Sequence, residues 1–567
     1  MDFANVDLQA SDVTTNGSYT FPHGFIWSTA TAAYQVEGAA FEDGKWIVSH
    51  RSKGVSMGGG GADGRFLGRV GSDRQWDYQG FRKGAAGRMR WSGGFAGRAP
   101  STWDRFVRLP GKIDDNSTAD VACDSYHLYA SDIELMKNLG VKQYRFSISW
   151  SRILPHGLVD FVNTKGVEYY NKLIAELIKN GIEPMVTLYH WDLPLAIADR
   201  GGWLNPQIVD WFGEYARFCF KTFGDQVKHF ITLNEPWSQA KFGYANGIHA
   251  PGGFNENGDW TAYLVAHHFL LAHATAYHIY DNEFRATQKG QVGITNVGMW
   301  FEPETPSDVD AARRALEWQF DWFTHPIFGR YGNYPERMIQ RIADRSRSEN
   351  RSVSRLPSFT QQQIEFVKGS ADFLGFNYYT AFLARERRPE EFGKNEDVLQ
   401  VDAGVVESQN PEWKRRAICL SISYLLQPIG PPNSWLQQYP EGFRKILNYI
   451  RENYNNVTVI ITENGCMDQP GEDLEDETRV SYLFEHLKML SLAINEDHCN
   501  VIGYTLWSLM DNFEWSSGYT FRFGIHHVLK KFRSLQVDFD DPKRKRTPKK
   551  SAEWFKETIA HNSIMHK

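Results

Sequence analysis

The sequence predicts an α/β protein folded as a single (β/α)8 barrel with long βα loops, and two observations support this. Eight short runs of apolar, β-branched or aromatic residues recur at wide spacing, with helical patterns between them. Near-continuous apolar strands separated by helices indicate a parallel sheet covered on both faces. Eight strand–helix units fit a closed barrel. The expected strands are Phe25–Ala30, Tyr144–Trp150, Pro184–Tyr189, His229–Leu233, Gln291–Val297, Phe373–Tyr379, Val457–Thr462 and Val501–Leu506.

Two of the intervening helices are clear in the sequence. Asp132–Leu139 carries apolar side chains at helical spacing and is followed by Gly140, and Val167–Lys179 has the same period and is followed by Asn180-Gly181. A glycine just after the last periodic residue is a typical helix stop. The pattern alone also allows an open, doubly wound sheet as the alternative to a barrel.

The barrel is expected to occupy residues 21–560, between an N-terminal tail of residues 1–20 and a C-terminal tail of residues 561–567. Residues 48–96 do not fit it, because they contain 13 Gly and carry seven Arg and two Lys against three Asp. This stretch lacks helical or strand periodicity, so we expect a disordered insertion. Two further polar loops are expected at Arg341–Arg355 and Arg385–Arg416.

The composition is that of a folded protein of ordinary charge. Hydrophobic residues make up 42% and charged residues 23%, and the net charge of −6 argues against a nucleic-acid partner. No run of 18 apolar residues occurs, so no membrane span is expected. The five cysteines are far apart and form no CxxC pair, which predicts reduced thiols. The first 20 residues contain neither the basic segment nor the apolar segment of a secretory signal, so we expect a cytoplasmic protein. The sequence is compatible with a monomer and with an oligomer.

Three motifs are weak. Gly59, Gly61 and Gly64 match G-x-G-x-x-G, but no strand precedes them and no helix follows, as a dinucleotide site requires. The basic run Pro542–Lys550 resembles a nuclear-localisation patch and is interpreted as a solvated chain end. Four histidines in one helical stretch have neither an HExxH motif nor a carboxylate partner, so neither a metal nor a cofactor is expected. They are His267, His268, His273 and His278.

The residues that indicate chemistry lie at the ends of the expected strands. Glu235 follows one apolar run in the segment FITLNEPW, and Glu463 follows another in VIITENG. Catalytic groups of barrel enzymes lie at the carboxyl ends of strands, although one such glutamate alone could simply cap the next helix. Each glutamate also has an asparagine beside it, Asn234 and Asn464.

Further polar and aromatic side chains are expected at the same end of the barrel. Amides and carboxylates bond sugar hydroxyls and indoles cover the apolar face of a sugar ring, so the set suits a neutral polyhydroxylated ligand. Two carboxylates flanking a glycosidic bond are the apparatus of glycoside hydrolysis. The set comprises Gln35, Arg145, His190, Asn377, Tyr379, Trp507 and Glu514.

The blocks around these residues resemble glycoside hydrolase family 1, and within it the β-glucosidases of cytosolic fungal members. The resemblance runs from Phe21 to about Phe555, and the number and order of the blocks make it specific. The blocks are FIWSTATAAYQVEG, YRFSISWSRILP, TLYHWDLP, TLNEPW, FLGFNYYT, ITENG and LWSLMDNFEWSSGYTFRFGI.

The resemblance implies a retaining β-glucosidase that releases terminal non-reducing β-D-glucosyl residues from cellobiose, cello-oligosaccharides or aryl and alkyl β-glucosides, with a role in cellulose degradation. Glu463 would be the nucleophile and Glu235 the acid/base, with the two carboxyl groups about 5–5.5 Å apart. Trp237 would border the leaving group. Arg145, Asn377 and Tyr379 would flank the nucleophile, and the sugar would contact Gln35, His190, Asn234, Tyr379, Trp507, Glu514 and Trp515.

The same resemblance separates related activities. Thioglucosidases of the family carry glutamine at the acid/base position, so Glu235 favours O-glycosides. Phosphoglycosidases place a phosphate-binding serine and lysine where this chain has Glu514-Trp515-Ser516, and a carboxylate there would repel a phosphate. The sequence therefore favours an unphosphorylated glucoside, with galactoside or fucoside side activity.

Three departures from the family pattern bear on activity. Ser28 stands where glycine is usual, residues 528–536 are extra, and residues 48–96 split a loop that should be continuous. Because Val48-Ser49 can be encoded by a splice-donor sequence and Ala96-Gly97 by an acceptor, we interpret 48–96 as a retained intron, with a real surface insertion as the alternative. A catalytically impaired sugar-binding member disabled by this insertion remains the alternative function. An open-sheet oxidoreductase is a third hypothesis, favoured only by the glycine motif.

Overall fold

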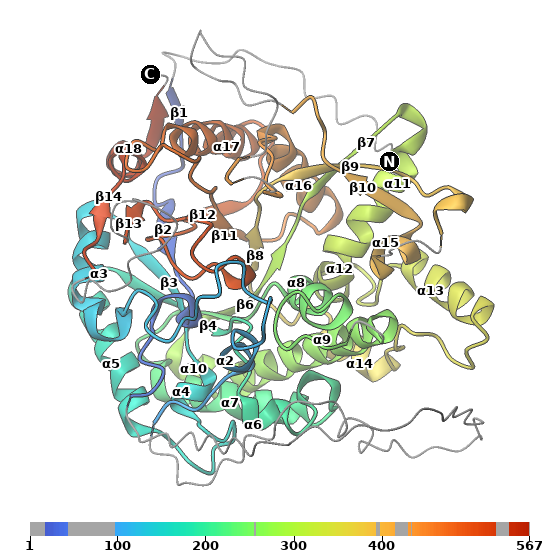
Figure 1. The fold of residues 1–567 in the computed structure, drawn as a ribbon, viewed down its shortest axis with the longest axis horizontal. Helices are drawn as coiled ribbons and strands as arrows, with labels where there is room; N and C mark the ends of the chain where they lie inside the picture. The colour runs from blue at the N-terminus through green and yellow to red at the C-terminus, as the bar shows by residue number, and fades with distance from the viewer. Residues whose placement is uncertain are drawn as a thin grey trace, which may run out of the picture.

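The computed structural model describes residues 18–42, 97–254, 257–392, 397–413, 429–431, 434–528 and 544–565. Within them, eight parallel strands close into a barrel in the order β11-β12-β2-β3-β4-β5-β6-β8 (Figure 1). The strands are β2 (Ile26–Ala30), β3 (Gln143–Ser147), β4 (Glu183–Tyr189), β5 (His229–Asn234), β6 (Gln291–Val297), β8 (Leu374–Asn377), β11 (Val459–Asn464) and β12 (Val501–Leu506). Each predicted apolar run supplies one of them, so the predicted (β/α)8 barrel is confirmed and the open sheet is wrong.

Long helices form the outer layer around these strands (Figure 1). They are α3 (Ser125–Leu139), α5 (Thr164–Lys179), α7 (Ile208–Phe223), α9 (Gly258–Glu283), α13 (Glu336–Ser348), α16 (Pro440–Asn453), α17 (Glu477–Asn495) and α18 (Lys550–His561). The predicted helices at 132–139 and 167–179 lie within α3 and α5. In α5, Tyr170, Leu173, Ile174 and Leu177 recur at helical spacing and are buried, which seats this face on the barrel.

Shorter helices occupy the loops between the barrel strands and the outer layer. They are α1 (Ala33–Val36), α2 (Thr102–Phe106), α4 (Trp150–Ile153), α6 (Leu195–Ala198), η3 (Gly202–Leu204), α8 (Pro236–Ser238), η4 (Gln239–Ala245), α10 (Arg285–Gln288), η5 (Pro306–Asp308), α11 (Val309–Leu316), η6 (Glu317–Asp321), α12 (Trp322–Phe328), α14 (Gln361–Val367), η7 (Pro389–Glu391), α15 (Val398–Ala403) and η8 (Trp515–Ser517). The long βα loops of the prediction therefore carry helical turns of their own.

The two expected polar loops also contain regular structure. Helix α13 begins before the first of them and buries Met338 and Ile342. In the second, β9 (Ala381–Glu386) is the middle strand of a small sheet with β10 (Val405–Ser408) and β7 (Trp300–Pro303). The loop prediction was wrong there because charged side chains such as Arg385 and Glu386 hide the short apolar pattern of a half-exposed strand.

The first and last described strands pair with each other. Strand β1 (Ser18–Thr20) pairs antiparallel with β15 (Ser563–Met565), so each expected tail contains a strand. A second two-stranded sheet joins β13 (His526–His527) to β14 (Thr547–Pro548). The predicted insertion at 48–96 and its glycine motif lie outside the described residues, as does the extra segment 528–536 apart from Val528.

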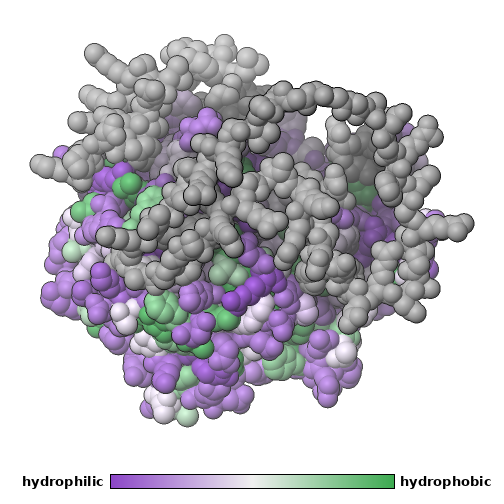
Figure 2. Space-filling view, turned by 60° about the horizontal axis from the view of Figure 1, so that its bottom comes forward, coloured by the Kyte–Doolittle hydropathy of each residue, from purple (hydrophilic) through white to green (hydrophobic). Residues whose placement is uncertain are grey.

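The core lies between the barrel and the outer helices and is rich in aromatic rings. Trp150, for example, is fully buried and stacks on Tyr215 with ring centroids 4.4 Å apart. Buried histidines of α9 are part of this core: His273 bonds Thr232, and His268 bonds the carbonyl oxygen of Trp203. The face in Figure 2 is mostly hydrophilic where residues are described, with separate apolar patches. In the described part of the chain, no helix has both the length and the apolar character that crossing a bilayer requires.

Candidate active site

Glu463, near the end of β11, has its carboxylate held by one donor from β3 and one that follows β8. Arg145 of β3 donates from Nη1 to Glu463 Oε1 at 2.5 Å, and the hydroxyl of Tyr379, just after β8, donates to Oε2 at 2.7 Å. The Glu463 side chain is 5% exposed. Burial and then the charge of Glu463 raise the pKa of Tyr379 well above its usual value, so Tyr379 remains a donor. Both oxygens thus face groups that favour an ionised carboxylate.

The turn after Glu463 depends on a glycine. A Cβ atom at Gly465 would lie 1.9 Å from the carbonyl oxygen of Trp507, at the end of the adjacent strand β12. Only glycine permits this close approach of the two strand ends. In the segment TENG, packing therefore explains the glycine, and the contacts of the carboxylate explain the glutamate.

Glu235 follows β5 directly and has a different environment. Its backbone is left-handed, with φ of 45°, which turns the chain into helix α8. Asn377 Nδ2 donates to Glu235 Oε1 at 2.6 Å, and Ser238 Oγ donates to Oε2 at 2.7 Å. Burial, and next the negative charge of Glu463, raises the pKa of Glu235 to about 7. Glu235 can therefore carry a proton near neutral pH.

Two asparagines connect these carboxyl groups. Asn377 lies beside Glu463 in the β8–β11 register and donates to Glu235. Asn234 accepts from Arg145 Nη2 through Oδ1 at 2.6 Å, while its Nδ2 lies 3.0 Å from His190 Nε2. Because all the side chains in this hydrogen-bonded series are buried, each one restricts the position of the next.

A third carboxylate lies on the loop after β12. Glu514 Oε2 accepts from Gln35 Nε2 at 3.2 Å, and the same Nε2 contacts Asn512 Oδ1 and the carbonyl oxygen of Phe513, both at 3.0 Å. Burial and then the charge of Glu463 raise the pKa of Glu514 to about 8. The Oε1 atom of Gln35 is buried without a partner among the described residues, so it is available to a ligand donor.

Aromatic rings surround the histidine of this site. His190 lies 5.9 Å from the Trp507 ring and 5.8 Å from the Trp515 ring, nearly parallel to each. Burial and then Arg145 lower the pKa of His190 well below its usual value, so the ring is neutral. Its Nε2 accepts from Asn234, which leaves the proton on Nδ1.

Trp237 follows Glu235 by two residues and lies in helix α8. Its Nε1 donates to the carbonyl oxygen of Trp318 at 3.1 Å, which fixes the ring. The ammonium of Lys241 lies 4.8 Å from the centre of the same ring and pairs with Asp397 at 2.8 Å. The segment that follows Glu235 therefore combines an indole with a charged pair.

The structure brings together all twelve side chains that the sequence singled out, because all lie at or near the carboxyl ends of the barrel strands. Trp435 was missed: it is 37% exposed and meets Tyr379 edge-to-face at 5.9 Å. Asn512 and Ser238, which orient Gln35 and Glu235, were missed too. Asn512 lies in the last motif block, which could have signalled it, whereas Ser238 follows the block TLNEPW and its residue type is not distinctive on its own.

Comparisons with known proteins show that the chain belongs to glycosyl hydrolase family 1. The sequence profile of Glycosyl hydrolase family 1 matches residues 17–51 and 90–564 and leaves 52–89 unmatched. Beta-glucosidase 12 of Oryza sativa is 44% identical over 562 residues, which is 95% of this chain and 92% of the relative.

Solved structures are similar over the same length. An aphid myrosinase superposes with a TM-score of 0.78 at 36% identity, covering 96% of this chain and 100% of that one. The rice β-glucosidase Os3BGlu6, in a covalent complex with Glc, has a TM-score of 0.76 at 40% identity and covers 94% and 98%. A β-glucosidase of the fungus Humicola insolens, in complex with glucose, has a TM-score of 0.75 at 35% identity and covers 96% and 98%. These comparisons thus do not single out the fungal members.

Proposed function

We propose that this chain, which belongs to glycosyl hydrolase family 1, is a retaining β-glucosidase acting on terminal non-reducing β-D-glucosyl residues. One observation carries the proposal: two buried glutamates, at the carboxyl ends of β5 and β11, have opposite environments. Glu463 is paired with a guanidinium, whereas burial and then the charge of Glu463 raise the pKa of Glu235 to about 7. An ionised and a protonated carboxyl side by side are what double displacement at a sugar carbon needs.

In the first step, Glu463 attacks the anomeric carbon as the bond to the leaving oxygen breaks. Glu235 gives its proton to that oxygen, so the aglycone departs as a neutral alcohol. The glucosyl group remains bound to Glu463 as an ester. Arg145 and Tyr379 hold the attacking carboxylate in place through their hydrogen bonds.

In the second step, Glu235 acts as a base. Once Glu463 is esterified, the negative charge that raised the pKa of Glu235 is gone, and its carboxylate is the better tolerated form. Glu235 takes a proton from water, and the water oxygen attacks the anomeric carbon and releases Glu463. Two inversions at one carbon give net retention.

The sugar would be bound by the groups around Gln35 and Glu514. Glu514, Gln35, His190 and Asn234 offer acceptors and donors to hydroxyl groups, and Trp507 and Trp515 offer apolar ring faces. Trp237 would border the leaving group, and the half-exposed Trp435 is a candidate second surface for it. These roles rest on the family motifs together with the contacts described above.

The relatives support a glucoside as substrate. Two of the similar structures hold glucose or a covalently bound glucosyl group, although the similarity to an aphid myrosinase makes a thioglucoside a substrate to test. The glutamate at position 235 favours an O-glycoside. The compartment and the contribution to cellulose breakdown stay predictions.

The alternative, a sugar-binding protein without turnover, depends on the insertion at 48–96. The family profile leaves most of this stretch unmatched, which supports our interpretation of it as foreign to the glycosidase fold. A variant without these 49 residues is expected to be at least as active as the full chain, and sequencing the transcript tests whether the stretch is spliced out.

A panel of nitrophenyl glycosides on the purified full chain and on the shortened variant tests the function. We expect the β-glucoside to be turned over fastest, the β-galactoside and β-fucoside more slowly, and a thioglucoside least. Proton NMR of the first product should show the β-anomer of glucose. Release of the α-anomer would contradict retention, and inactivity of both chains on every glycoside would contradict the enzymatic proposal.

A further inference from the structure

The basic run near the C-terminus is not a solvated chain end, contrary to its interpretation from sequence. Arg544 is 7% exposed and donates to the carbonyl oxygen of Ala122 at 2.7 Å. Arg546 pairs with Asp132 at 2.7 Å. Lys549 is 1% exposed, whereas its neighbour Lys550 has a 38% exposed side chain. Arg544, Arg546 and Lys549 therefore point into the protein, whereas Lys550 does not.

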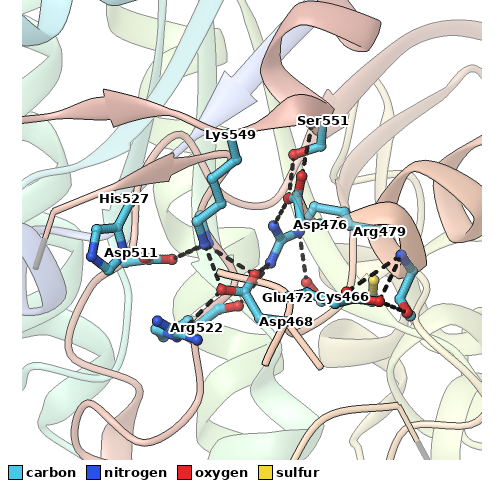
Figure 3. Close-up of polar contacts among 12 residues, drawn as sticks. Cys466, Asp468, Glu472, Asp476, Arg479, Asp511, Arg522, His527, Lys549 and Ser551 are labelled. Atoms are coloured by element: carbon cyan, nitrogen blue, oxygen red, sulfur yellow. Dashed lines mark hydrogen bonds and ion pairs between the residues drawn. The ribbon is translucent and has the colours of Figure 1, made fainter. Parts of the chain in front are cut away.

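Lys549 lies between two aspartates from different loops (Figure 3). Its Nζ lies 2.8 Å from Asp468 Oδ2 and 3.0 Å from Asp468 Oδ1, on the loop after β11. The same Nζ lies 2.8 Å from Asp511 Oδ1, on the loop after β12. Both carboxylates are almost fully buried, so the ammonium is a strong link between the two loops. The backbone nitrogen of Asp468, which donates to the carbonyl oxygen of Arg522 at 3.0 Å, is a second link.

A balanced set of charges surrounds this contact. Arg479 of α17 donates to Asp468, to Asp476 and to the carbonyl oxygen of Cys466 at 3.1 Å. Arg522 lies 3.3 Å from Asp468 Oδ2. Figure 3 shows the side chains converging from the two loops, α17 and the start of α18. Three cations and three aspartates thus compensate one another in the interior.

Asp511 connects this network to the sugar-binding end of the candidate site. Its Oδ1 accepts from the backbone nitrogen of Gly524 at 3.0 Å, and a Cβ at Gly524 would lie 1.9 Å from the Asp511 nitrogen, so the loop is closed tightly here. The next residue, Asn512, contacts Gln35 at 3.0 Å, and Gln35 donates to Glu514. Lys549 is therefore three contacts away from Glu514.

We propose that Lys549 is a positioning residue that sets Glu514 and Gln35 against the sugar by holding the Asp511 loop to the Asp468 loop. This inference rests on the proposed function, in which Glu514 binds the glucosyl unit. Without the ammonium, Asp468 and Asp511 would repel each other, and Asp511 would keep its contacts with Gly524, His526 and His527. The loop between Asp511 and Glu514 would then lose its charged anchor. Sugar binding should then weaken even though no residue that touches the sugar has changed.

The test compares Lys549→Met with Lys550→Met, a matched change at the adjacent, exposed lysine. For each full-length variant, kcat and KM on nitrophenyl β-glucoside, glucose affinity by calorimetry and the thermal midpoint are measured. We expect Lys549→Met to lower kcat/KM and glucose affinity at least tenfold, and Lys550→Met to stay within about twofold. Lys549→Arg, which keeps the charge, should recover part of the loss.

A double-mutant cycle separates positioning from general destabilisation. If Lys549 acts through Glu514, the Lys549→Met change should cost at least tenfold in the parent and less than about twofold in a Glu514→Ala background. An equal factor in both backgrounds, or no loss in the parent, overturns the inference. If Lys549→Met does not fold, the charge-balanced pair Lys549→Met/Asp511→Asn takes its place, and failure of both to fold overturns the inference in favour of a purely structural role.

Failure of the proposed function can be distinguished from failure of this inference. If the parent hydrolyses no glycoside, glucose affinity alone decides: a tenfold loss in Lys549→Met but not in Lys550→Met supports the positioning role in a sugar-binding protein. A parent that binds no glucose contradicts both the inference and the glycoside site.

Discussion

Two clusters of carboxylates, each with one carboxylate residue on the loop after β12, differ in how their charge is balanced. The strand-end cluster holds Glu235, Glu463 and Glu514, with Arg145 paired to Glu463. The second cluster holds Asp468, Asp476 and Asp511 together with the three cations Arg479, Arg522 and Lys549. Both are built from ordinary acidic side chains at similar depth, so the difference lies in the cations.

This difference in charge balance shifts the pKa values of the carboxyl groups in opposite directions. Burial and then Glu463 raise the pKa of Glu235 to about 7, so this carboxyl exchanges a proton near neutral pH. Burial would also raise the pKa of Asp511, but Lys549 and His527 lower it well below its usual range. Incomplete compensation is thus what makes a carboxyl reactive, and full compensation makes it part of the scaffold.

The largest expected effect comes from removing the charge of Glu463. Glu463→Gln is nearly isosteric but cannot attack carbon, so kcat should fall roughly 10³-fold or more while the thermal midpoint changes little. Glu475→Gln, a matched change at an 80% exposed side chain on the same loop, should leave kcat unchanged. Residual activity within about tenfold of the parent would mean that Glu463 is not the nucleophile.

The second expected effect depends on the leaving group. Glu235→Gln should slow glucosides with poor leaving groups roughly 10²–10⁴-fold, because they need a proton. Activated aryl glucosides should still form the ester, and azide should then restore turnover and give β-glucosyl azide. Equal losses on all substrates without an azide effect would count against the acid/base role.

A third prediction compares the two clusters by the pH dependence of the free energy of unfolding. Glu235 has a raised folded pKa, so its contribution to stability is present below its unfolded value of about 4.3 and is lost as pH rises toward 7. Glu235→Gln should therefore be more stable than the parent at pH 8, on the order of 1–3 kcal/mol, and lose this gain near pH 4.

The contribution of Asp511 to stability depends on pH with the opposite sign. Its folded pKa is lowered, so its stabilisation is complete above its unfolded value of about 3.9 and is lost as pH falls further. Asp511→Asn should destabilise by about 3–5 kcal/mol at pH 7, because Lys549 loses one of its two carboxylates. Denaturant unfolding measures Glu235→Gln between about pH 4 and pH 8 and Asp511→Asn between about pH 2 and pH 5. In these ranges the stability difference from the parent should change with pH in opposite directions, and slopes of the same sign would contradict the comparison.

The smallest effect is a shift in the titration of Glu235. In Glu463→Gln the pKa of Glu235 should fall below about 7, since burial still raises it but the neighbouring charge no longer does. Infrared difference spectra of the carboxyl stretch follow this proton, with the double variant Glu463→Gln/Glu235→Gln as the blank. An unchanged midpoint would show that the two carboxyl groups do not interact.

Much of the candidate site could be predicted because chemistry and strand ends coincide in the sequence. Glu235 and Glu463 follow recognisable apolar runs, and the carboxyl ends of parallel strands must meet at one end of a barrel. Gln35 and Glu514 were also expected as polar groups at this end of the barrel, and the motif blocks implied their contact with the sugar. Trp435 could not be predicted, because a lone tryptophan in a proline-rich stretch is equally typical of a core residue.

The sequence alone was enough for the barrel, since hydrophobic periodicity is local and each apolar run reports its own strand. Tertiary structure decided which charges are compensated. Lys549 and Lys550 are chemically identical neighbours, yet one is buried between Asp468 and Asp511 and the other is exposed beside Glu477. Partners that lie 38 and 81 positions away cannot be read from local pattern. Long-range packing sets the electric environment of each carboxyl, and with it which of them can react.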